Sequence, residues 1–121
     1  MTSAKGKHAP AAHKKRLKIG VVDFFCGSGG VSAGLKSIKG AAEFHIIEGI
    51  DIDPHCARTF ENMIGAPCRE IDITRLARDR KFLAETIASW RLDRFDRVLL
   101  IGCSPCQGFS AHRKSIDGPD Q

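Results

Sequence analysis

Four apolar segments alternate with three segments of helical character, and this alternation limits the fold more than any other feature. Strands are expected at 19–25, 44–52, 68–71 and 98–101, and between them apolar residues recur at helical spacing. A β-α-β-α-β-α-β order is typical of a parallel sheet with right-handed crossovers. The sequence therefore predicts an α/β fold whose ligands bind at the carboxyl ends of the strands.

Residues with preferences for helix ends set the predicted helix boundaries. Asp53 and Pro54 are expected to begin the second helix, as N-cap and first-turn proline. Gly40 is expected to stop the first helix. Thr74 is expected to cap one longer helix that extends to Trp90.

The positive charge is concentrated at the N-terminus. The formal net charge is +5, but residues 1–18 carry six basic residues and no acid, whereas the remainder has 13 basic and 14 acidic residues. Such a tail fits a nucleic-acid-binding arm, or a solvated leader or tag remnant, and the second interpretation is favoured. We expect a basic, disordered tail over 1–18 and a folded portion over 19–121 that has no basic footprint for DNA of its own.

The apolar residues do not form a membrane anchor. The longest apolar runs fall short of the roughly 18 residues of a membrane span, and the N-terminus lacks the apolar stretch of a signal peptide. We therefore expect a cytoplasmic protein with no membrane partner, associated with the nucleoid if it is bacterial. In that compartment the five cysteines are expected to be thiols.

A glycine-rich loop follows the first expected strand, since residues 23–30 read Asp-Phe-Phe-Cys-Gly-Ser-Gly-Gly. Glycines there let the backbone approach a ligand closely. The next strand ends in Asp51, about twenty residues further on, where a carboxylate can accept both hydroxyls of a ribose. We expect the strand ends at 25–30, 51–53 and 103–106 to converge on one crevice. This combination favours a nucleoside cofactor over a simple tight turn.

Successive segments of the chain resemble the motifs of DNA (cytosine-5) methyltransferases. Residues 23–30 resemble Asp-Leu-Phe-x-Gly-x-Gly-Gly, residues 71–73 resemble Gly-Asp-Ile, and residues 103–107 resemble Gly-x-Pro-Cys-Gln, with Phe-Ser shortly after. The motif-like segments occur in family order, and the resemblance covers residues 19–121. The departures from the family pattern are Phe24 for Leu, Ile71 for Gly and Cys103 for Gly.

The resemblance implies a partial Rossmann-like fold of S-adenosylmethionine-dependent methyltransferases, with a mostly parallel sheet and S-adenosyl-L-methionine as cofactor. Phe25 would stack on the adenine, Asp51 would hold the ribose, and Asp72 would accept a hydrogen bond from the adenine amino group. A helix cap near Thr74 is an equally good interpretation of Asp72. The cofactor-binding residues implied are Phe25, Cys26, Gly27, Ser28, Gly29, Gly30, Asp51, Ile52, Asp72, Ile73 and Pro105.

The same resemblance implies that Cys106 is the catalytic nucleophile. Cytosine C5 is a poor nucleophile, and attack of a thiolate on C6 raises the electron density at C5, which then accepts the methyl group. The target base must leave the stack, so duplex DNA with a flipped cytosine is the implied partner. Gln107 and Ser110 are the candidate DNA contacts. The implied process is DNA methylation, as in a restriction-modification system.

Cys103 and Cys106 also form a Cys-x-x-Cys pair with a proline before the second cysteine, which is typical of a thioredoxin-like redox site. That alternative is disfavoured because only 15 residues follow Cys106 and because it leaves the glycine loop and Asp51 unexplained. A zinc site is disfavoured too, since the other cysteines have no second paired spacing. We therefore expect no metal.

Other family elements are not recognised after Cys106: the acid that contacts cytosine N3, the Arg-x-Arg element and the target-recognition region. The sequence thus predicts an incomplete enzyme that does not methylate DNA by itself. It could be a fragment, a subunit completed by a second chain, or a truncated, inactive cofactor-binding module. In each case the fourth strand is expected to form an exposed apolar edge.

Overall fold

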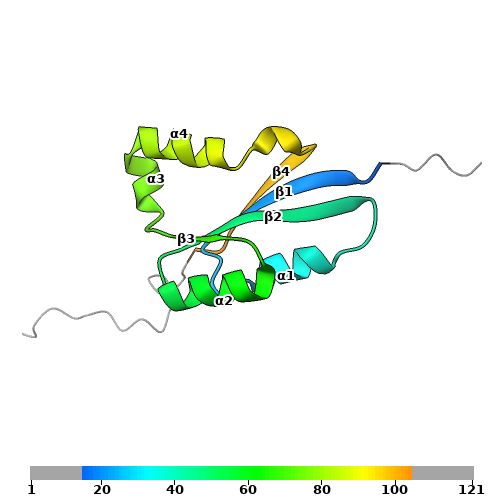
Figure 1. Cartoon of the computed structure of the whole chain (residues 1–121), viewed down its shortest axis with the longest axis horizontal. Helices are drawn as coiled ribbons and strands as arrows, with labels where there is room; N and C mark the ends of the chain where they lie inside the picture. The colour runs from blue at the N-terminus through cyan, green and yellow to red at the C-terminus, as the bar shows by residue number, and fades with distance from the viewer. Residues whose placement is uncertain (1–14, 105–121) are drawn as a thin grey trace, which may run out of the picture.

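The computed structural model describes residues 15–104 (Figure 1). The elements are β1 (Leu17–Phe24), α1 (Gly30–Ser37), β2 (Ala42–Asp51), α2 (Pro54–Ile64), β3 (Cys68–Glu70), α3 (Thr74–Arg78), α4 (Arg80–Ser89), the 3₁₀ turn η1 (Leu92–Arg94) and β4 (Arg97–Gly102). The strands pair in parallel in the order β3-β2-β1-β4. The predicted α/β fold with a parallel sheet is confirmed, and this order is that of a partial Rossmann-like sheet.

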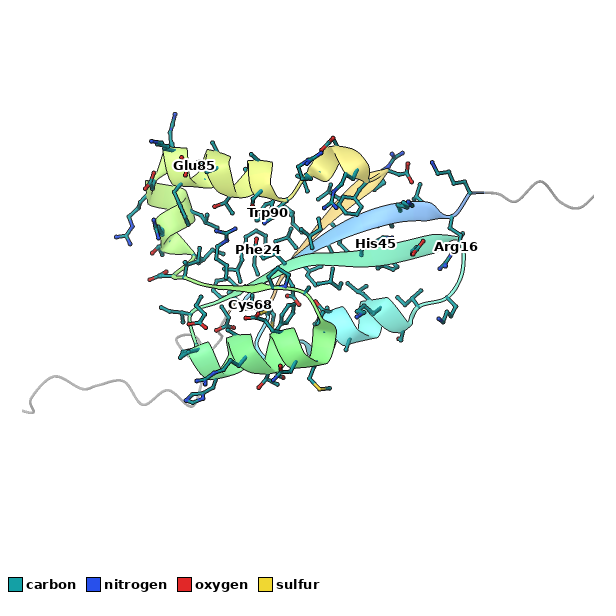
Figure 2. The ribbon with its side chains drawn as sticks, viewed as in Figure 1. Arg16, Phe24, His45, Cys68, Glu85 and Trp90 are labelled. Atoms are coloured by element: carbon teal, nitrogen blue, oxygen red, sulfur yellow. The ribbon has the colours of Figure 1, made fainter. Side chains whose placement is uncertain are left out.

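The helices lie in two layers, with α1 and α2 on one face of the sheet and α3 and α4 on the other (Figure 1). Each layer buries its own apolar cluster. Figure 2 shows Phe24 and Trp90 between the sheet and α4. Their ring centroids are 6.3 Å apart, and the rings meet edge to face. The clusters are Cys26, Phe60, Ile64 and Ala66 beside α2, and Val22, Ile50, Leu76 and Trp90 beside α3 and α4.

The predicted start of α2 is confirmed, whereas the predicted end of α1 is not. Asp53 caps α2 as predicted, because its carboxylate accepts hydrogen bonds from two backbone N–H groups of the first turn, where Pro54 also lies. The predicted end of α1 at Gly40 is wrong. The helix ends at Ser37, since Ile38 already has extended backbone (φ −69°, ψ 126°).

The single long helix predicted from Thr74 to Trp90 is also wrong. Two helices, α3 and α4, are separated by Asp79, which has extended backbone (φ −116°, ψ 96°). The Asp79 carboxylate accepts the backbone N–H of Phe82 at 3.0 Å and so caps α4. Thr74 is the first residue of α3 rather than its cap.

A bulge in β2 buries a carboxylate that the sequence prediction did not single out. The register between β1 and β2 shifts after Val21, so Ile47 is an extra residue in β2. Glu48, which is buried, accepts hydrogen bonds from Arg69 Nε at 2.7 Å and from Trp90 Nε1. This network joins β2, β3 and the end of α4.

β4 lies at the edge of the sheet and is poorly covered. Leu100 is 58% exposed and Val98 is 40% exposed, although both are apolar. The predicted exposed apolar edge is therefore confirmed.

Candidate functional site

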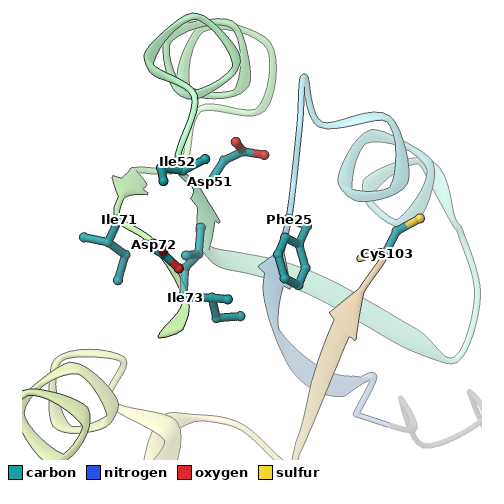
Figure 3. A pocket seen from close by; sticks show the side chains of 8 residues that line it. Phe25, Asp51, Ile52, Ile71, Asp72, Ile73 and Cys103 are labelled. Carbon is teal, nitrogen blue, oxygen red and sulfur yellow. The ribbon is translucent and has the colours of Figure 1, made fainter. Parts of the chain in front are cut away.

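A cavity of about 350 Å³ lies at the carboxyl ends of the strands (Figure 3). This volume is in the range of small-ligand sites. All four strands, or the loops that follow them, contribute to its lining, as expected for the crevice of a doubly wound sheet. The lining residues are Phe25, Ile50, Asp51, Ile52, Ile71, Asp72, Ile73 and Cys103.

Phe25 directly follows β1 and supplies an aromatic wall. Its φ of 56° is in the left-handed region, which residues other than glycine seldom adopt and which often marks functional sites. The next residue, Cys26, donates its backbone N–H to the Ile50 carbonyl at 3.1 Å, so the loop stays attached to β2. In Figure 3 the Phe25 ring lies across the cavity from Ile52 and Ile73. The cavity therefore has apolar walls on two sides.

Asp51 ends β2 and is held by the backbone on both of its carboxylate oxygens. Oδ2 accepts the N–H of Gly27 at 2.9 Å, and Oδ1 accepts the N–H of Asp53 at 2.9 Å. The first bond fixes the glycine loop relative to β2, and the second fixes the start of the chain toward α2. Asp51 is thus a rigidly held carboxyl group at the cavity wall.

Asp72 also lines the cavity, and its carboxylate holds the first residue of α3. Its Oδ1 accepts both the backbone N–H of Thr74 at 2.9 Å and the Thr74 hydroxyl at 2.8 Å. The Thr74 backbone hydrogen bond is the main reason why the pKa of Asp72 lies below its ordinary value. Asp72 therefore presents an ionised carboxylate at the cavity, and the capping interpretation is compatible with a ligand contact.

The glycine loop lines a different hollow from the main cavity. Ser28, Gly29 and Gly30 line a shallow groove of about 250 Å³ next to α2, together with Met63. Gly29 has φ 96°, and a Cβ there would lie 2.8 Å from Ile64. Glycine at this position is thus required both by the backbone and by the approach of α2.

Asp23 is a buried carboxyl group near this site, and the sequence motifs assigned it no role. It is 4% exposed, and its Oδ2 accepts the hydroxyl of Ser32 at 2.7 Å, which ties β1 to α1. Burial raises the pKa of Asp23, against the effect of the Ser32 hydrogen bond. In the sequence, a carboxyl group within an otherwise apolar strand was the feature that could have indicated this buried group.

The candidate site residues separate into four groups, one of which is Ser28, Gly29 and Gly30 in the groove next to α2. Phe25, Asp51, Ile52, Asp72 and Ile73 meet at the cavity, and Cys103, Ile50 and Ile71 join them without having been predicted to bind. Cys26 is buried below the loop, and Gly27 contacts Asp51. Pro105, Cys106, Gln107 and Ser110 lie outside the described residues.

Residues 15–104 contain neither a cluster of metal ligands nor a membrane-spanning helix. Within that range, no three His, Cys, Asp or Glu side chains group as metal ligands would. The helices of the same range are all too short or too polar to cross a bilayer.

Comparison with known proteins gives two matches. Residues 19–120 match the family of C-5 cytosine-specific DNA methylases. Type II methylase M.HgiDII of Herpetosiphon aurantiacus is 33% identical over 94 residues, which are 78% of this chain and 23% of the relative. The chain thus spans about a quarter of the length of that curated relative. The family match covers most of the chain, so the protein belongs to the C-5 cytosine-specific DNA methylase family.

Proposed function

We propose that this chain is the cofactor-binding portion of a DNA cytosine-5 methyltransferase, with S-adenosyl-L-methionine in the cavity at the carboxyl ends of the strands. The observation that carries the proposal is the pairing of an apolar slot with two fixed carboxylates, Asp51 and Asp72, in one cavity. Such a pairing suits a nucleoside, which has a flat base and polar edges.

The chemistry of the lining residues fits this cofactor. Phe25 and Ile52 offer apolar surfaces for the two faces of a purine. Each Asp51 oxygen receives one backbone hydrogen bond, which leaves further lone pairs for ribose hydroxyls. The Asp72 side chain accepts its hydrogen bonds within residues 15–104 through Oδ1. Its Oδ2 can therefore accept a hydrogen bond from the adenine amino group.

When bound, the cofactor supplies an electrophilic methyl group for C5 of cytosine. Cys106 is the proposed nucleophile, on the basis of its Pro-Cys-Gln motif. Its Sγ bonds to C6 of a cytosine flipped out of duplex DNA, and the electron pair of the C5–C6 double bond moves to C5. After methylation, loss of the C5 proton restores the double bond and expels the thiolate. Pro105 is proposed to line the cofactor site, and Gln107 and Ser110 to contact DNA.

The biological setting we propose is a restriction-modification system, because the curated relative is named a type II methylase. The chain spans 23% of that relative. We therefore assign the reading of the DNA sequence to protein outside these residues, either further along the same polypeptide or in a second chain. The 121-residue chain is then expected to bind the cofactor and not to methylate DNA alone.

Calorimetric titration of the chain with S-adenosylmethionine tests the cofactor assignment. We expect binding by the unaltered chain and a loss of affinity of about 10- to 100-fold in Asp51→Ala, since hydrogen bonds to a charged group are removed. Asp93→Ala is the matched control, because Asp93 is an exposed acid in η1. Circular dichroism would establish that both variants are folded. Equal affinity in the two variants would refute the role of Asp51.

A further inference from the structure

Two thiols meet beneath the glycine loop. Cys26 Sγ, from the loop after β1, lies 3.5 Å from Cys68 Sγ in β3. Gly49 of β2 lies between them: it pairs with Cys68 across the ladder, and a Cβ at Gly49 would lie 2.8 Å from Cys26 Sγ. The missing side chain at Gly49 thus allows sulfurs from two non-adjacent strands to come together. Figure 2 shows Cys68 on the face of the sheet that α2 covers.

We propose that Cys26 and Cys68 are a thiol-modification site, at which a peroxide converts the pair into a reversible disulfide. Hydrogen peroxide oxidises the Cys68 thiol to a sulfenic acid and is itself reduced to water. Cys26 Sγ then attacks the Cys68 sulfur, the S–S bond forms, and the oxygen leaves as a second water. Two equivalents of a small thiol such as glutathione restore both cysteines and become glutathione disulfide.

The exposure of the two thiols determines which one reacts first. Cys26 is 7% exposed, whereas Cys68 is only partly buried, so we expect a small peroxide to react first with Cys68. Burial raises the pKa of both thiols, so Cys26 in particular reacts poorly with reagents in solution. Its reaction depends on proximity, since an oxidised Cys68 sulfur would lie next to it.

The disulfide would change the wall of the cofactor cavity. Bond formation draws the two sulfurs from 3.5 Å to about 2.05 Å, and we expect residue 26, which lies in a loop, to move toward β3. Its neighbours are Phe25, an aromatic wall of the cavity, and Gly27, whose N–H holds Asp51. We therefore expect the oxidised chain to bind S-adenosylmethionine more weakly than the reduced chain. This consequence, unlike the bond itself, rests on the proposed function.

Peptide mass mapping of the full chain after peroxide treatment, without reduction, tests the bond. We expect a Cys26–Cys68 cross-link that dithiothreitol removes, and a rise in Tm of roughly 10 °C, because the link closes a loop between residues 42 apart. Cys68→Ser should abolish the link, whereas Cys56→Ser, which alters another free thiol, should not. A link between Cys103 and Cys106, or over-oxidation of Cys68 while Cys26 stays a thiol, would overturn the proposal.

Titration of the reduced and oxidised chains with S-adenosylmethionine separates the two proposals. Weaker binding only after oxidation supports the effect on the cavity. Equal binding by both forms rejects that effect and leaves the cofactor site intact. A reduced chain that does not bind counts against the proposed function alone, because the mapped cross-link does not depend on cofactor.

Discussion

The central strand β1 has β2 on one side and β4 on the other, and the two sides differ in how completely they are enclosed. On the β2 side, Glu48, Gly49 and Ile50 are buried between helices, and the strand ends in the fixed carboxylate of Asp51. On the β4 side, apolar side chains such as Leu100 remain exposed. The stability of the fold and the architecture of the cavity therefore depend mainly on β1, β2, β3 and their helices.

The largest effect is expected in the core of the β2 side. Phe60 is fully buried against Gly49 and the glycine loop, so Phe60→Ala should lower the free energy of unfolding by about 3–5 kcal/mol. Leu100→Ala, on the open β4 side, should cost less than about 1 kcal/mol. Urea denaturation measures both. Similar losses in the two variants would remove the distinction between the sides.

An intermediate effect is expected from the buried network of β2. Glu48→Gln keeps an acceptor for Trp90 but loses the ion pair with Arg69, and should cost about 2 kcal/mol in urea denaturation. The control is Glu43→Gln, because Glu43 pairs with His45 at the surface and such pairs contribute about 1 kcal/mol or less. If both variants lost the same small free energy of unfolding, the Glu48 network would not contribute to the stability of the core.

The features predicted from sequence are those decided by nearby residues. Strand and helix alternation, the Asp53 cap and the convergence of strand ends on one cavity follow from local patterns and from the geometry of parallel sheets. The position of Asp51 at a strand end was also predicted. The hydrogen bond that Asp51 accepts from Gly27 was not, because it depends on the left-handed turn of the loop after β1.

The features that sequence reasoning missed depend on distant partners. The burial of Glu48 requires a bulge in β2 and donors that lie 21 and 42 residues away. The break between α3 and α4 at Asp79 competes with a helical apolar pattern that continues across it. The meeting of Cys26 with Cys68 depends on the empty space over Gly49. Of these features, only the break has a local signal, because Asp is a favoured residue at the start of a helix.

A smaller, pH-dependent effect is expected at Asp23. Burial raises its pKa in the folded state, so stability is full below the pKa of the unfolded chain and declines as the pH rises through the folded value. Asp23→Asn still accepts the Ser32 hydroxyl and removes this decline. The Tm of the variant, relative to that of the unaltered chain, should therefore rise between about pH 3 and pH 7. Asp93→Asn, at an exposed site, should show no such pH-dependent rise in relative Tm. A Tm difference for Asp23→Asn that stays constant over this pH range would contradict the account.

The most direct test of the central claim is a map of amide chemical shifts in ¹⁵N-labelled chain as S-adenosylmethionine is added. The account predicts shifts at Gly27, Asp51, Asp53 and Ile73, around the cavity at the carboxyl ends of the strands. A second hollow of about 380 Å³, lined in part by His45 and Phe95, lies away from these strand ends and should not respond. Shifts confined to that second hollow, or no shifts at saturating cofactor, would contradict the assignment.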